Sequence, residues 1–475
     1  MKLVKRLFAL LITLALTLSI ASCAVGDFNA SKNDSDGGRL DGGIIGSKPS
    51  LDYGESESGD SYDSSTPEAP SDSTPGDDSS PGDDSEATEP DSDEIEPSEP
   101  GDKDKIESIT RPAGLITAGA WNDNENYEYW KSLFEQGEKN GKFYNYTGDK
   151  AWGFDSYGRL TLKVTYGDSN AAVAGATVVA RDSEDKDIYT AVTDANGIAY
   201  LFTSGEGGKV TVDSGEYSDT AIYEGKTNEE ISIKLRGAAE KKNIIDIMFV
   251  VDVTGSMNDE LWFLKNELAD VINEVAANDK NAVINLALLF YRDNGDSVPF
   301  AYYDFLDVTN PENLSVQQVN LNAQNASGGG DFPEAVDEAL MLAVNKQWNT
   351  GATTKLLFHV LDAPPHSTEN NKTTFKAAVE AASAKGIRIC PVICSGTDIL
   401  TEYLMRQAAV YTAGTFIFVT DDSGIGNSHY DPQLPNVTVE TLNSLLVRLI
   451  NGYHSGEFAP PVYWKQEQFN NQNKQ

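Results

Sequence analysis

The residues best suited to do chemistry in this 475-residue chain are one carboxylate and two hydroxyls in a short loop. The loop, residues 252–256, carries Asp252, Thr254 and Ser256 and follows the nearly continuous apolar run 244–251. Such a run predicts a strand that is covered on both faces. Oxygen ligands without histidine favour a hard divalent cation, of which Mg²⁺ fits best and Ca²⁺ or Mn²⁺ are alternatives. We therefore expect a metal site at this loop.

The elements that must position this loop alternate between strand and helix patterns. The sequence predicts strands at 284–291, 299–306, 356–361, 387–394 and 415–420, and helices at 258–277, 333–348, 370–385, 401–412 and 438–452. This alternation is typical of an α/β fold with a doubly wound, mostly parallel sheet. Ligands of such sheets bind beyond the carboxyl ends of the strands. Residues that follow other strands should therefore lie near the loop.

Further carboxylates do follow these strands. Asp362 comes after the strand ending at residue 361, Asp398 comes shortly after the next strand, and Asp421 and Asp422 close the last. We expect them at the same edge of the sheet as the loop. His366 either orients a ligand there or bonds within its own loop.

Three separated motifs resemble the metal-ion-dependent adhesion site of von Willebrand factor type A domains. Asp252-x-Thr254-x-Ser256 is similar to the Asp-x-Ser-x-Ser loop of that family, and the likeness extends over about 243–455. The resemblance implies a Rossmann-like fold in which the hydroxyls of Thr254 and Ser256 ligate the metal directly. It also implies that Asp252 and Asp362 act largely through water.

The chain departs from the family in the loop between these motifs, where a threonine is usual. Residues 327–334 are Ser-Gly-Gly-Gly-Asp-Phe-Pro-Glu. The resemblance to type A domains with such a loop implies that Asp331 takes the place of the threonine as a metal ligand. An added carboxylate should strengthen cation binding and weaken the attraction for a partner's carboxylate, which argues against integrin-like adhesion. The alternative is that Asp331 caps a helix near Pro333, with Ser327 or a water as the ligand.

The N-terminus indicates export. Basic residues precede the apolar run 7–20, which is short for a membrane span of about 20 residues and fits a secretion signal better. Small residues before Cys23 resemble a bacterial lipobox, so we expect residues 1–22 to be a lipoprotein signal peptide and Cys23 to carry the lipid anchor. The protein would then lie at the cell membrane, facing out of the cytoplasm. The alternative is an ordinary signal peptide with an incidental cysteine.

The segment that follows Cys23 is predicted to be a disordered acidic linker, residues 23–105. Residues 24–107 hold 25 acidic and 5 basic residues, a net charge of −20 within a total of −38. Few apolar residues and many like charges favour an extended, disordered chain. A protein with this negative charge repels nucleic-acid phosphates, and we therefore expect no nucleic-acid partner.

Between the linker and the metal-loop domain we expect an aromatic-rich connecting region, 106–157, and a β domain, 158–236. Alternating apolar residues and glycine-containing turns predict a small antiparallel sandwich there. Residues 173–178 and 193–199 resemble carboxypeptidase regulatory-like domains, which implies a stalk or binding unit. Residues 456–475 form a polar tail.

Cys390 and Cys394 should not bridge each other. Four residues of strand separate Cα atoms by roughly 13 Å, whereas a disulfide needs about 7 Å or less. We expect two buried thiols, although a metal pair is possible.

The leading functional hypothesis is a non-catalytic surface module that binds a protein or glycan through its metal. A structural scaffold whose metal only stabilises the fold is one alternative, and a metal-dependent hydrolase is another. The chain has four histidines and neither a His-Glu-x-x-His nor a Gly-x-Ser-x-Gly motif, so the hydrolase is less favoured.

Overall fold

A computed structural model of the chain describes residues 116–135, 142–147, 151–226, 228–238, 243–423 and 430–467. The predicted signal peptide, Cys23, the acidic linker and the end of the polar tail lie outside these residues. The described residues belong to one compact unit. Within the described part, no helix is long and apolar enough to span a membrane.

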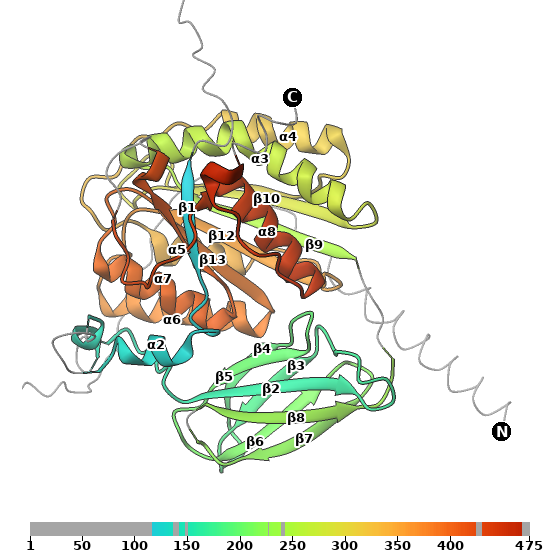
Figure 1. Ribbon diagram of the computed structural model, residues 1–475. Helices are drawn as coiled ribbons and strands as arrows, with labels where there is room; N and C mark the ends of the chain where they lie inside the picture. The colour runs from blue at the N-terminus through green and yellow to red at the C-terminus, as the bar shows by residue number, and fades with distance from the viewer. Residues whose placement is uncertain are drawn as a thin grey trace, which may run out of the picture. The chain divides into compact units, whose positions relative to one another are not determined.

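The metal-loop domain is built on one large, mostly parallel sheet, as the sequence predicts. In the described part of the chain it has eight strands in the order β11-β10-β9-β12-β13-β14-β1-β15 (Figure 1). The central five pair in parallel, whereas β11, β1 and β15 are antiparallel to their neighbours. The strands are β1 (Thr117–Trp121), β9 (Ile244–Asp252), β10 (Val283–Tyr291), β11 (Phe300–Asp307), β12 (Thr354–Leu361), β13 (Ile387–Ile393), β14 (Phe416–Thr420) and β15 (Glu440–Thr441).

Helices cover both faces of this sheet because its strands are apolar on both sides. On β9, Ile247 and Phe249 belong to one buried cluster, while Met248 and Val250 belong to another. The first cluster also contains side chains from α3 (Asn258–Asn278), α4 (Pro311–Asn322) and α8 (Leu442–Ser455). The second contains side chains from α5 (Val336–Val344), α6 (Glu369–Ala384) and α7 (Ile399–Thr412). The fold is therefore doubly wound.

Some element boundaries differ from the predicted ones. Helix α4 was not predicted, although Asn310 and Pro311 are strong start signals: the Asn310 side chain accepts a hydrogen bond from Glu312 N, and proline suits a first turn. Helix α5 begins at Val336 rather than at Pro333, and α8 begins at Leu442 rather than near 438. Cys390 and Cys394 are separate buried thiols, as expected.

Strand β1 comes from the predicted connecting region and completes the large sheet. It pairs along its length with β14, from Thr117 opposite Thr420 to Trp121 opposite Phe416. The sequence does not predict this role, because a five-residue strand carries little periodicity. The β domain is therefore inserted between β1 and β9, within the large domain rather than before it.

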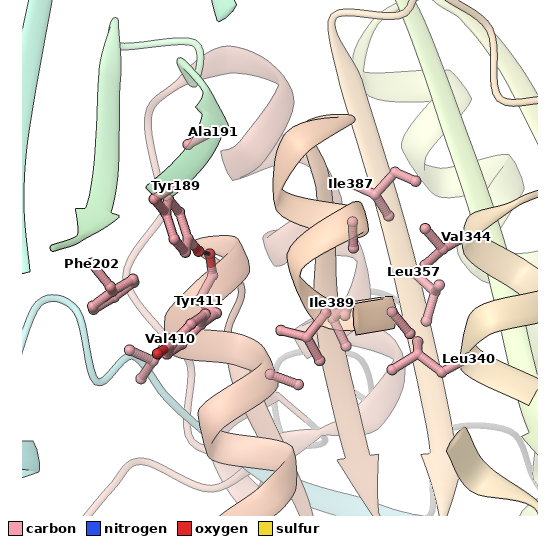
Figure 2. Packing of buried hydrophobic residues seen from close by; sticks show 14 of the residues in the cluster. Tyr189, Ala191, Phe202, Leu340, Val344, Leu357, Ile387, Ile389, Val410 and Tyr411 are labelled. Atoms are coloured by element: carbon pink, nitrogen blue, oxygen red, sulfur yellow. Dashed lines mark hydrogen bonds between the residues drawn. The ribbon is translucent and has the colours of Figure 1, made fainter. Parts of the chain in front are cut away.

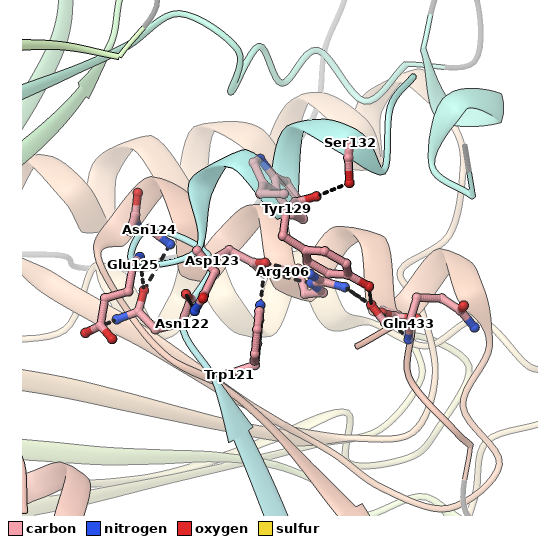
Figure 3. Close-up of polar contacts among 12 residues, drawn as sticks. Trp121, Asn122, Asp123, Asn124, Glu125, Tyr129, Ser132, Arg406 and Gln433 are labelled. Atoms are coloured by element: carbon pink, nitrogen blue, oxygen red, sulfur yellow. Dashed lines mark hydrogen bonds and ion pairs between the residues drawn. The ribbon is translucent and has the colours of Figure 1, made fainter. Parts of the chain in front are cut away.

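Buried charges fix the chain directly after β1. Arg406 of α7 donates hydrogen bonds to Asp123 at 2.6 and 2.8 Å and to Glu402 at 2.8 Å. Trp121 donates to the same Asp123 carboxylate at 2.9 Å (Figure 3). Arg406 also donates to the carbonyl of Gln433. This network joins β1, α7 and the segment before α8.

The inserted domain consists of two small packed sheets, β5-β2-β8 and β4-β3-β6-β7, over the residues that the structure describes. The predicted domain is an antiparallel sandwich, whereas β2 and β8 run parallel. The strands are β2 (Arg159–Tyr166), β3 (Thr177–Arg181), β4 (Asp187–Val192), β5 (Ile198–Phe202), β6 (Gly208–Asp213), β7 (Ser218–Tyr223) and β8 (Glu229–Leu235).

The sandwich packs on α7 of the large domain through aromatic side chains. Tyr189 of β4 donates a hydrogen bond of 2.6 Å to the carbonyl of Tyr411 (Figure 2). The Phe202 ring stacks on the Tyr411 ring, with 4.5 Å between the ring centroids. The Tyr411 hydroxyl accepts a hydrogen bond from Asp155 N at 2.7 Å. One continuous cluster of buried apolar residues joins the two parts.

Candidate metal centre

The metal loop begins where β9 ends, at Asp252. The carboxylate of Asp252 is buried, and its Oδ1 accepts hydrogen bonds from Thr254 N at 2.8 Å and from the Thr254 hydroxyl at 2.7 Å. These bonds fix the turn and leave the lone pairs of the Thr254 hydroxyl available to a cation. The other oxygen, Oδ2, is buried and has no hydrogen-bond partner among the described residues.

Asp362 reaches the same place from the end of β12. Its burial raises the pKa of the carboxyl to about 6. A hydrogen bond from the Ser256 side chain lowers this pKa, and the charge of Glu260 raises it, but both effects are smaller than that of burial. Ser256 itself is exposed in the short turn η3 (Gly255–Met257), directly before α3. The structure thus brings together Asp252, Thr254, Ser256 and Asp362, four of the five predicted site residues.

The glycine-rich loop lies directly against the metal loop. Gly255 N donates to the carbonyl of Gly328 at 3.3 Å, and Ser327 N donates to the carbonyl of Val253 at 2.9 Å. Gly328 and Gly329 have φ of 82° and 76°, a left-handed conformation that favours glycine. Arg292 supports the loop by donating to the carbonyl of Ser327 at 2.8 Å. Arg292 also donates to the carbonyls of Val298 and Asn325.

Asp331, the fifth predicted site residue, is exposed on this loop. Its alternative role as a helix cap is wrong, because α5 begins at Val336 with Ala335 at the N-cap and no side-chain cap. The direct ligand role of Asp331 remains a prediction.

The buried carboxylate of the loop is Glu334, which sequence analysis did not single out. Only 4% of Glu334 is exposed, and its Oε2 has no hydrogen-bond partner in the described part of the chain. Its backbone N donates to the carbonyl of Pro364 at 3.0 Å, just beyond Asp362. Burial, then the charges of Asp252, Asp293 and others, raise the pKa of Glu334 to about 9. A signal was available in the sequence, because Glu334 stands next to a proline in a glycine-rich loop.

A further carboxylate, Glu260 of α3, lies behind the site. Its Oε1 accepts hydrogen bonds from the Ser395 hydroxyl at 2.9 Å and from Ser395 N at 3.3 Å, while Oε2 is buried without a partner among the described residues. Burial, and next the charge of Asp362, raise the pKa of Asp252 to about 7. Negative charge is therefore crowded at this edge of the sheet with few donors to neutralise it.

The donor set fits a hard divalent cation. Unpartnered buried oxygens of Asp252, Glu260 and Glu334 are costly unless a proton or a cation neutralises them. Across the described ranges, no three histidine, cysteine, aspartate or glutamate side chains converge closely enough to hold a metal. A cation here would therefore need hydroxyl ligands, and Thr254 and Ser256 supply them.

Two other residues expected at this edge, Asp398 and His366, have structural partners. Asp398 caps α7, accepting hydrogen bonds from Thr401 N at 2.8 Å and from its hydroxyl at 2.7 Å. The His366 ring forms a hydrogen bond of 2.8 Å with the Asp293 carboxylate. This side chain therefore orients Asp293 and does not bond within its own loop. Asp421 and Asp422 begin a loop whose continuation, residues 424–429, lies outside the described residues.

Residues 246–408 match the family model of the von Willebrand factor A domain, so the chain contains such a domain. A curated relative, the alpha-protein kinase vwkA of Dictyostelium discoideum, is 28% identical over 193 residues. That match covers 39% of this chain and 27% of the relative, so the chain spans about a quarter of the relative's length.

Solved structures are similar over part of the chain. BatB of Bacteroides thetaiotaomicron is 14% identical with a TM-score of 0.29, and the match covers 44% of this chain and 98% of that one. The pilus adhesin SpaC of Lactobacillus rhamnosus GG, in its open conformation, is 10% identical with a TM-score of 0.32. That match covers 62% of this chain and 34% of the adhesin.

Proposed function

We propose that this protein is a non-catalytic, cation-dependent binding module, held at the outer face of a membrane by a lipid on Cys23. The cation is Mg²⁺ or another divalent ion, and the partner is a surface protein or glycan. One observation carries the proposal. Buried carboxylate oxygens without hydrogen-bond partners among the described residues occur in the same site as the Thr254 and Ser256 hydroxyls. The von Willebrand factor A domain at 246–408 supports it.

The position of Ser256 supports partner binding. Ser256 is exposed whereas Asp252, Thr254 and Asp362 are buried. A cation held by these residues would therefore face buried side chains on one side and solvent on the side of Ser256. The open side is where an external oxygen donor, from a protein or a glycan, completes the coordination.

The residues present favour binding over hydrolysis. Zinc-type activation of water needs histidine or thiolate ligands. The three described histidines have other partners: His359 bonds Tyr291, His366 bonds Asp293, and His454 bonds Thr354 and Asn243.

The first test is titration calorimetry of the folded protein with Mg²⁺ and Mn²⁺. One site is expected, lost in Ser256→Ala and retained in Ser183→Ala, because Ser183 is an exposed serine in the inserted sandwich. Failure of the unsubstituted protein to bind either ion would refute the proposal.

A second experiment separates the alternatives. The immobilised protein is incubated with purified candidate surface proteins and glycans, with Mg²⁺ or with EDTA. Retention that needs Mg²⁺ and is lost in Ser256→Ala supports the binding module. A cation that raises the melting temperature without any retention favours the structural scaffold, and turnover of an ester or peptide substrate favours the hydrolase.

A further inference from the structure

Glu334 and Thr254 approach each other across Gly329. A methyl group added at Gly329 would lie 2.7 Å from Glu334 Oε1 and 3.3 Å from Thr254 Cβ. These two side chains come this close only because residue 329 has none. The left-handed φ of 76° at Gly329 also favours glycine. Glycine at this position therefore lets the Glu334 carboxylate lie beside Thr254 of the metal loop, whose Cβ and methyl Cγ2 face residue 329.

The position of Glu334 is fixed from both sides of its backbone. Its N–H bonds the carbonyl of Pro364, and the residue forms a parallel bridge with Pro365. Helix α5 begins two residues later, at Val336. These contacts hold the backbone of Glu334 against the segment after Asp362.

Neither protonation state of Glu334 is satisfied by the protein alone. As an anion, Oε2 lacks a donor, and as an acid it lacks an acceptor, within the described residues. Asp252 and Asp362 both lie close enough for their charges to act on Glu334. A cation on the Thr254 side would satisfy the unpartnered oxygen and offset this repulsion.

We propose that Glu334, rather than Asp331, is the carboxylate of the glycine-rich loop that ligates the divalent cation directly. This inference rests on the proposed metal site. Thr254 and Ser256 contribute hydroxyl oxygens, and Asp252 and Asp362 act behind them through hydrogen bonds. Asp331 is exposed and leaves its charge at the rim of the site.

The assignment has a consequence for the partner. Asp252, Glu334 and Asp362 together carry three negative charges when ionised, against two positive charges on the cation. The loaded site therefore stays anionic and repels an incoming carboxylate. A neutral donor, such as a hydroxyl or a backbone carbonyl, is the better match for its open position.

The test is titration calorimetry with Mn²⁺ and Mg²⁺ on the unsubstituted protein and on Glu334→Gln, Glu334→Ala, Asp331→Asn and Ser256→Ala. Both Glu334 variants are expected to bind at least tenfold more weakly, since even residues that only orient ligands change affinity by roughly 10–100-fold. Asp331→Asn is expected to change affinity within about threefold, because an exposed charge is screened. Without metal, Glu334→Gln should melt at or above the temperature of the unsubstituted protein, which shows that it folds.

The outcomes separate the two proposals. If the unsubstituted protein binds and Ser256→Ala does not, while Glu334→Gln binds normally, the metal site stands and the role of Glu334 is refuted. Loss of binding in Asp331→Asn with normal binding in Glu334→Gln assigns the ligand to Asp331 instead. If the unsubstituted protein binds no cation, both proposals fail.

Discussion

The Asp123 carboxylate and the Arg406 guanidinium form two hydrogen bonds, of 2.8 and 2.6 Å, although 283 positions separate them in the sequence. Both side chains are buried, and Arg406 also bonds Glu402. Because Asp123 directly follows the strand that completes the large sheet, this pair fastens an N-terminal segment to α7.

Asp123→Ala should lower the free energy of unfolding by about 3–5 kcal/mol, because it leaves part of the buried Arg406 charge without its partner. The measurement is urea denaturation followed by far-UV circular dichroism. Lys372→Ala, which breaks the surface pair with Glu369, is the control and should change stability by less than about 1 kcal/mol. Equal effects of the two substitutions would contradict a stabilising role for the buried pair.

The loss of stability with rising pH should be smaller when metal is added. Asp252 and Asp362 have folded-state pKa values of about 7 and 6, raised from 3.8 mainly by burial. Because these groups hold protons more tightly when folded, their stabilising contribution is complete below about pH 4 and is lost as pH rises towards 7. Each group costs about 1.4 kcal/mol per pH unit within that window.

Melting temperatures at pH 5.5 and 7.5, with EDTA or with saturating Mg²⁺, measure this effect. In EDTA, Asp252→Asn should be stabilised relative to the unsubstituted protein at pH 7.5, and about half as much at pH 5.5. Mg²⁺ should stabilise the unsubstituted protein more at pH 7.5, because it binds the ionised site. A Mg²⁺ effect that is larger at pH 5.5 would count against this assignment of the carboxylates.

Gly329→Ala should destabilise the protein by about 1–3 kcal/mol and also weaken cation binding, since it combines a left-handed φ with a 2.7 Å contact to Glu334 Oε1. Gly175→Ala is a matched control: its φ is 75°, and a methyl group there meets nothing within 4 Å. Both variants should show the conformational cost in thermal unfolding. Calorimetry should detect a loss of cation affinity in Gly329→Ala alone.

Tyr189→Phe should reduce stability by about 1–3 kcal/mol, because it removes the donor to the buried carbonyl of Tyr411 and keeps the ring. Denaturation followed by tryptophan fluorescence measures the change. Tyr144→Phe, at an exposed tyrosine, should be neutral. If Tyr189→Phe is also neutral, the hydrogen bond does not help to hold the sandwich on α7.

Sequence alone determined the parts of this protein that depend on neighbouring residues. The apolar run of β9 and the Asp252-x-Thr254-x-Ser256 spacing lie within 13 consecutive residues, and the structure keeps them as strand and loop. Alternating strand and helix patterns likewise predicted the doubly wound sheet, because burial on both faces leaves a mark along each strand. Asp362 was predicted because it directly follows one of these strands.

Tertiary structure decided what depends on contacts across the chain. Strand β1 is too short to carry a pattern, and its place is set by pairing with β14 and by the ion pair of Asp123 with Arg406. Asp331 and Glu334 stand three residues apart and are chemically alike. Only the packing of the glycine-rich loop against Thr254 and Pro364 buries one and exposes the other. Burial of a carboxylate is a property of the folded surroundings, which residue type and spacing do not record.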